Sequence, residues 1–117
     1  MKITKENLYE KGFINSRPEE PYDFGTEYWT YLRKILALGD ILVMINKTNE
    51  LKKIGLISEF YTPRSRFVED TREYVEFLKR SLGRQRRKLK KEPHDPILNG
   101  RIEFIKDVIR ELKSYDA

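Results

Sequence analysis

The sequence contains no cysteine, a single histidine and no long apolar run. A chain without cysteine forms neither a disulfide framework nor a thiolate metal site, and a lone histidine has no second imidazole with which to complete a metal or nucleophile site. No segment approaches the roughly 20 consecutive apolar residues of a spanning helix. The sequence therefore predicts no cofactor, no metal, no catalytic constellation and no membrane partner.

Composition sets the size and class of the molecule. Its 117 residues suit one compact domain. Apolar residues make up 38% of the chain and charged residues 37%, a balance that still supports a folded core. The opening stretch MKITKENLYEKGF carries frequent charges and lacks the apolar segment of a signal peptide, so we expect a cytoplasmic protein.

Positive charge is concentrated in one segment, KRSLGRQRRKLKK, residues 79–91, which holds eight basic residues and no acidic one. The whole chain carries +5, but the remainder, with 16 basic and 19 acidic residues, carries −3. A local basic patch on a mildly acidic body is typical of a directed electrostatic site. The distribution therefore favours an anionic partner.

The first part of the chain predicts a short helix and a loop. Thr4 is placed as the N-cap, and Ile3 and Leu8 as a hydrophobic staple, of a helix that stops at Gly12. Two prolines and a glycine in residues 15–25 then predict an irregular surface connection.

The central stretch, residues 26–61, is predicted as a three-stranded antiparallel meander. Gly39-Asp40 lies between the runs EYWTYLRKIL and ILVMIN and suits a tight reversal, and KTNELKK then serves as a longer hairpin loop before IGLISEFY. Residues 28–36 also obey helical spacing, so a helix remains open there. Their aromatic and β-branched residues favour the strand.

The last part predicts two helices, after a turn or edge segment fixed by Pro63. Asp70 and Glu73 make a capping box that opens the first helix, and Asp95 with Pro96 opens the second. Each helix carries an apolar stripe at steps of three and four residues: Val75, Leu78, Leu82, Gln85 and Leu89, then Leu98, Ile102, Ile105, Ile109 and Leu112. Matching stripes joined by a short loop predict an antiparallel helical hairpin.

The expected fold is therefore α+β, with a helix and an antiparallel sheet in residues 1–68 and the hairpin in residues 69–117, packed on the sheet or extending from it. One alternative remains open. Gly83 could end the first helix as a C-cap and leave residues 84–92 as a basic arm.

The order of these patterns resembles a group of small uncharacterised proteins from bacterial phages and mobile elements. The resemblance rests on the short helix ending in GF, the aromatic strand, the GDI that opens an apolar strand, and RFVEDTREYVEFLK, and it extends to Leu82. It implies an α+β core and a phage-like origin in a bacterial host cell, and it carries no catalytic residue. The basic helix and the last helix depart from the group.

The basic segment is the candidate binding site. On a helix, Arg80, Arg84, Arg87 and Lys91 fall on one arc opposite the apolar stripe, with Lys88 beside them. A ridge of one sign repels itself, so an anionic partner would relieve the repulsion. We expect binding to nucleic acid, RNA or DNA, or to a nucleoprotein or acidic protein surface. The candidate residues are Arg80, Arg84, Arg86, Arg87, Lys88, Lys90 and Lys91.

The phage-like resemblance extends this hypothesis to an inhibitor of a host defence nucleoprotein, such as an RNA-guided nuclease, in an anti-CRISPR-like role. The rival hypothesis is an interaction module that forms a homodimer through its helical hairpin. Apolar residues flanking the main stripes would provide that surface: Tyr74, Phe77, Phe104 and Val108.

Two weaker patterns concern aromatic and acidic residues. A base-stacking platform could form on the sheet, although a small domain needs such side chains in its core. Its members would be Tyr28, Trp29, Tyr31, Phe60 and Tyr61. Asp40, Glu50 and Lys52 have the D…E-x-K spacing of a nuclease metal site, but the last two fall in a predicted loop rather than on a rigid strand. His94 is expected to be a loop residue beside a helix cap. Because none of these patterns makes a catalytic site, we expect a non-enzymatic protein.

Overall fold

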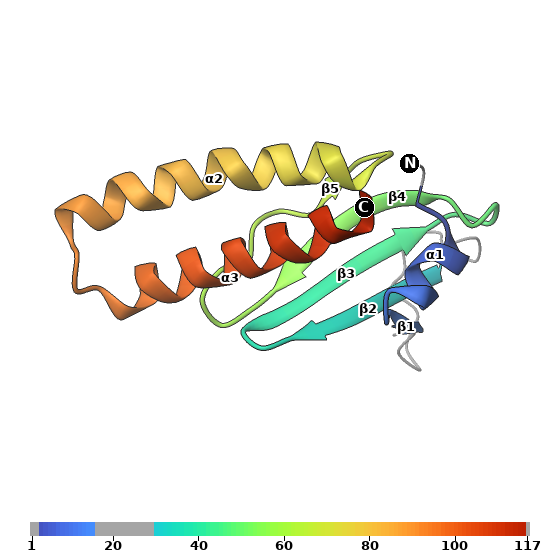
Figure 1. The fold of residues 1–117 in the computed structure, drawn as a ribbon, viewed down its shortest axis with the longest axis horizontal. Coiled ribbons are helices and arrows are strands. Elements are labelled where there is room, and N and C mark those ends of the chain that lie inside the picture. The colour runs from blue at the N-terminus through green and yellow to red at the C-terminus, as the bar shows by residue number, and fades with distance from the viewer. Residues whose placement is uncertain (1–2, 16–29, 117) are drawn as a thin grey trace.

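The computed structural model describes residues 3–15 and 30–116, and these have the α+β architecture expected from the sequence (Figure 1). An antiparallel sheet with strand order β1-β2-β3-β4-β5 carries α2 and α3 on one face, and the short helix α1 lies at one end. The elements in chain order are α1 (Lys5–Glu10), β1 (Ile14–Asn15), β2 (Thr30–Leu36), β3 (Gly39–Ile45), β4 (Leu51–Ile57), β5 (Arg66–Phe67), α2 (Thr71–Lys91), α3 (Pro96–Lys113) and a 3₁₀ turn (Ser114–Asp116). None of the described helices is both long and apolar enough to cross a lipid bilayer.

The N-terminal helix forms as predicted. The Thr4 side chain accepts a hydrogen bond from an amide in the first turn at 3.4 Å, and Ile3 and Leu8 are each 1% exposed. Gly12 follows with a φ of +93°, a left-handed conformation that glycine adopts without a Cβ penalty. Of the connection predicted over residues 15–25, the first residue belongs to the short strand β1, and the rest lies outside the described residues.

Strands β2, β3 and β4 form the meander predicted for the centre of the chain. Residues 30–36 are a strand and not a helix, while the first two residues of the predicted strand lie outside the described part. Leu32, Val43 and Ile54 form one row across the three strands, and each is at most 1% exposed. Because side chains alternate between the faces of a strand, this row identifies the face that the helices cover.

The reversal between β2 and β3 differs from the prediction at Gly39-Asp40. The turn consists of residues 37–38, and Gly39 already pairs with Leu36 as the first residue of β3. A Cβ atom at Gly39 would lie 2.5 Å from the carbonyl oxygen of Ile57. The glycine is therefore required by close packing against β4, and the turn itself is made by the two residues before it.

The loop between β3 and β4 is shorter than the predicted KTNELKK. It comprises residues 46–50, and the following residues 51–53 belong to β4. The side-chain oxygen of Asn46 accepts hydrogen bonds from the amides of Thr48 and Glu50, each at 3.0 Å. These local bonds close the loop early and return the lysines to the sheet.

Helix α2 runs without a break through Gly83, so the alternative in which it ends there is wrong. Asp70 caps the helix by accepting from the Arg72 amide at 2.7 Å, and the Glu73 carboxylate accepts from the Glu69 amide at 3.4 Å. In the predicted capping box the Glu73 carboxylate would accept from the amide of Asp70, the cap residue. It accepts instead from the amide of the residue before the cap.

The two C-terminal helices form the predicted antiparallel hairpin (Figure 1). Their stripe residues are buried or half-buried against each other and the sheet: Val75, Leu78, Leu82, Gln85 and Leu89 on α2, and Leu98, Ile102, Ile105, Ile109 and Leu112 on α3. One hydrophobic cluster extends from Ile3 to Tyr115. The segments 1–68 and 69–117 therefore share a single core.

The surface predicted for a homodimer is not available. Tyr74, Phe104 and Val108 are each 0% exposed, because the sheet packs against the face that a second copy was expected to cover. Phe77 is half-buried, with its ring stacked on Tyr74 and beneath the guanidinium of Arg66. The prediction that Tyr74, Phe104 and Val108 are exposed for contact with a second copy is therefore wrong.

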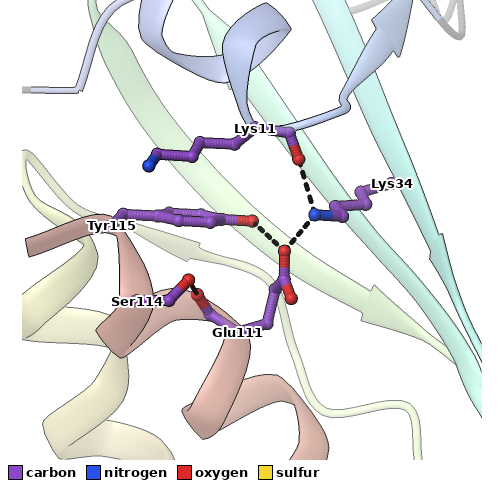
Figure 2. Close-up of polar contacts among 5 residues, drawn as sticks. All are labelled: Lys11, Lys34, Glu111, Ser114 and Tyr115. Atoms are coloured by element: carbon purple, nitrogen blue, oxygen red, sulfur yellow. Dashed lines mark hydrogen bonds and ion pairs between the residues drawn. The ribbon is translucent and has the colours of Figure 1, made fainter. Parts of the chain in front are cut away.

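A polar cluster joins α1, β2 and α3 at the end of the hairpin opposite the α2–α3 turn (Figure 2). Lys34 of β2 donates to the Lys11 carbonyl at 2.5 Å and pairs with the Glu111 carboxylate of α3. Tyr115 donates to the same carboxylate oxygen at 3.0 Å. Burial, followed by the negative charge of Glu111, raises the pKa of Tyr115 above its usual range. The cluster fixes the C-terminal end of α3 to β2 and to the end of α1.

Candidate nucleic-acid interface

Residues 79–91 of helix α2 carry only positive charge, and these charges repel one another. The helix is stable nevertheless, because contacts on its inner face and at its two ends stabilise it. The stripe packs against α3, and Asp70 caps the N-terminus. The hydrogen bond from the Arg72 side chain holds the pKa of the Asp70 carboxyl below its usual value. Lys88, Lys90 and Lys91 occupy the last turn, where positive charge interacts favourably with the helix dipole.

The seven candidate residues are all exposed: Arg80, Arg84, Arg86, Arg87, Lys88, Lys90 and Lys91. Within residues 3–15 and 30–116, none of them is ion-paired to a carboxylate. Other exposed cations on the helices do have such partners, for example Lys79 with Glu76 and Arg110 with Asp107. These seven cations therefore form no ion pair within the part of the chain that the structure describes.

The candidates fall into two groups around the helix. Four form a crest that occupies an arc of about 60° opposite the buried stripe: Arg80, Arg84, Arg87 and Lys91, with Lys88 on one side. The crest spans about 16 Å along the axis at roughly 1.5 Å per residue. Arg86 and Lys90 lie on the other flank, about 90–130° from the centre of the crest. The crest and Lys88 together present five cations to one surface.

The position of this basic face is set by the connection between β4 and β5. Phe60 packs on Gly100 of α3, where a Cβ atom would lie 2.4 Å from the ring, and Arg101 donates to the Phe60 carbonyl at 2.6 Å. Tyr61 shares a hydrogen bond with Ser81 of α2. Beyond these anchors the α2–α3 turn projects past the end of the sheet (Figure 1). A long anionic strand can therefore approach the crest without meeting the sheet.

Gln85 faces the protein, as its place in the stripe predicts. It is 6% exposed, although it is surrounded in the sequence by basic residues. The exposed side of α2 from Lys79 to its end therefore offers charged donors and no neutral hydrogen-bonding side chain. Such a surface matches phosphate oxygens and lacks the amide groups that commonly read base edges.

The stacking platform predicted from aromatic residues does not form among the described residues. Tyr31 is buried, and Phe60 and Tyr61 are half-buried against the helices. Tyr28 and Trp29 lie outside the described part of the chain. The three described rings serve the packing of the domain.

The D…E-x-K pattern does not form a metal site. Asp40 pairs with the last residue of β4, whereas Glu50 lies just before its first residue, so β4 separates them by roughly 20 Å. The Asp40 carboxylate instead accepts from Arg33 Nε at 2.8 Å. Lys52 lies in β4 and not in a loop, and His94 is exposed in the α2–α3 connection. No cluster of three or more potential metal ligands occurs in the described residues.

A hollow with a volume of about 200 Å³ was not expected from the sequence. Most of its lining residues, including Tyr31, Leu42 and Met44, alternate with the helix-facing row and so lie on the other face of the sheet. Its lining residues are Tyr31, Leu42, Val43, Met44, Lys53, Gly55 and Ser65. Apolar residues point to both faces of β3, and this pattern was the available sequence signal for an apolar surface on the second face. A strand that is buried on both faces shows the same pattern.

Comparison of the chain with protein-family models, with curated proteins and with solved structures gave no match. The geometry and charge of α2 are therefore the features that indicate a function.

Proposed function

We propose that this protein is a non-enzymatic binding protein that holds nucleic acid through the basic face of α2. The observation that carries the proposal is the set of seven exposed cations with no described carboxylate partner. Because a bound polyanion would relieve the repulsion among them, the free energy of binding contains a stabilisation that a mixed-charge face would lack.

The contacts are made with the phosphodiester backbone. Arginine side chains present a planar fork to phosphate oxygens, and the crest presents Arg80, Arg84 and Arg87 in succession. Sequence preference is weak, because no neutral amide or hydroxyl side chain accompanies them on the exposed face. Because RNA and DNA share this backbone, we expect both to bind.

The test is fluorescence anisotropy with labelled 20-nucleotide RNA, single-stranded DNA and duplex DNA of two unrelated sequences. We expect binding to these ligands with little difference between the sequences, and competition by unlabelled polyphosphate. An acidic protein of matched charge serves as the second competitor. If that protein binds and the nucleic acids do not, the partner is an acidic protein surface and the proposal fails.

A further step in the same proposal is inhibition of a host defence nucleoprotein, such as an RNA-guided nuclease. This anti-CRISPR-like role is supported by the phage-like resemblance of residues 1–82 and by the affinity for nucleic acid proposed above. Adding the purified protein to a guide-loaded nuclease should reduce target cleavage in proportion to its concentration. Unchanged cleavage at saturating protein would remove this step and leave nucleic-acid binding as the function.

A further inference from the structure

Gly83 is the one described glycine whose presence the packing does not explain. Gly12 has a left-handed backbone, and Cβ atoms at Gly39, Gly55 and Gly100 would lie at 3.0 Å or less from neighbouring atoms. At Gly83 a Cβ atom would meet only the end of the Arg87 side chain, at 3.6 Å, which is an ordinary contact. Glycine inside a helix lowers stability by about 1 kcal/mol relative to alanine. An alanine side chain would fit at residue 83, so packing does not offset the stability that glycine loses there.

The helical neighbours of Gly83 are all cations. Residues three and four positions away on a helix are its surface neighbours, and here they are Lys79, Arg80, Arg86 and Arg87. Lys79 is paired with Glu76 at 3.2 Å, and the other three have no ion pair with a described residue. Gly83 is thus a bare position on the helix surface with positive charge on every side.

We propose that Gly83 forms a notch that receives one phosphodiester group of the bound strand against the helix backbone. Side chains on a helix lean toward its N-terminus, so Arg86 and Arg87 lean over Gly83 from the following turn. One guanidinium nitrogen of Arg87 lies 3.6 Å from the position that a Cβ atom at residue 83 would occupy. Arg80 belongs to the preceding turn and by the same rule leans away from Gly83. A phosphate in the notch meets the guanidinium donors of Arg86 and Arg87, at a depth that a larger side chain at residue 83 would deny it.

This inference rests on the proposed function and is tested through residue 83 alone. Gly83→Ala and Gly83→Gln leave the net charge unchanged, and both residues favour helix, so Tm should rise by roughly 4 °C for Gly83→Ala. Gly83→Gln fills the notch and should remove about one phosphate contact. For duplex DNA at about 0.15 M salt, that loss weakens binding about 5-fold. It also makes the negative slope of log K against log salt shallower by about 0.9.

Ala37→Gln is the matched control, because it adds the same side chain at an exposed position in the β2–β3 turn. It should leave affinity and salt slope unchanged. Wild-type affinity and slope in Gly83→Gln would overturn the notch while leaving the proposed function in place. If the wild type binds no nucleic acid, the proposed function fails and the notch fails with it.

Discussion

Replacing Arg84 and Arg87 together with glutamine should weaken binding to duplex DNA about 30-fold at about 0.15 M salt. The four cations of the crest and Lys88 can together neutralise about five phosphates, which corresponds to a slope of log K against log salt of about −4 to −5. Each lost contact lowers affinity about 5-fold at this salt concentration, and two lost contacts leave a slope of about −3. The variant keeps the helix, because both positions are exposed and glutamine is a good helix former.

The assay is fluorescence anisotropy with a labelled duplex at five salt concentrations, with circular dichroism to verify that α2 remains folded. The control variant carries Arg110→Gln and Lys113→Gln. These two exposed cations lie at the other end of α3, so the control makes the same change in net charge away from the crest. Equal losses of affinity in the two variants would refute the reasoning, because binding would then depend on net charge and not on the crest.

Three further outcomes follow from the packing. Gly83→Ala should raise the free energy of unfolding in urea by about 1 kcal/mol, whereas Gly100→Ala should lower it, because its Cβ would lie 2.4 Å from an aromatic ring; changes of the same sign would contradict this. Phe104→Ala should cost about 3–5 kcal/mol without changing the oligomeric state in sedimentation, since the ring is fully buried; loss of a dimer at unchanged stability would contradict it. Burial, and then a nearby carboxylate, raises the pKa of Tyr115, so the unfolded state releases this proton near pH 10 while the folded state keeps it. Stability should therefore fall above about pH 10, and Tyr115→Phe should reduce that fall by up to about 1.4 kcal/mol per pH unit, measured by urea unfolding; an unchanged slope would contradict the assignment.

The parts of the fold that sequence predicted are those fixed by local chemistry. Thr4, Asp70 and Asp95 cap their helices through side-chain oxygens, and each was recognisable from its neighbours along the chain. The stripes of α2 and α3 were recognisable for the same reason, because a period of three and four residues is a local property.

The parts that sequence missed depend on contacts between distant segments. Gly39 was interpreted as a turn residue, whereas it is required by the approach of β4 and α3. Phe104 and Val108 were interpreted as free surface, because a helical pattern does not show that a sheet lies against a second side of the helix. A flanking apolar residue has the same local pattern whether a strand of its own chain or another molecule covers it.

The candidate site was predictable in composition but not in arrangement. Residues 79–91 marked the basic segment, and the stripe placed the crest opposite it. Sequence left open whether the helix continued through Gly83, and that continuity is what brings Arg80 and Arg87 onto one surface. The anchoring of the hairpin by Phe60 and Gly100 was also out of reach, since these residues are forty positions apart.

The most direct test of the central claim is amide chemical-shift mapping by NMR during titration with a short oligonucleotide. We expect the largest shifts on residues 79–91 of α2, with smaller ones at the α2–α3 turn. Shifts confined to the hollow side of the sheet, around Leu42 and Met44, would contradict this expectation and place the binding surface on the opposite face of the molecule.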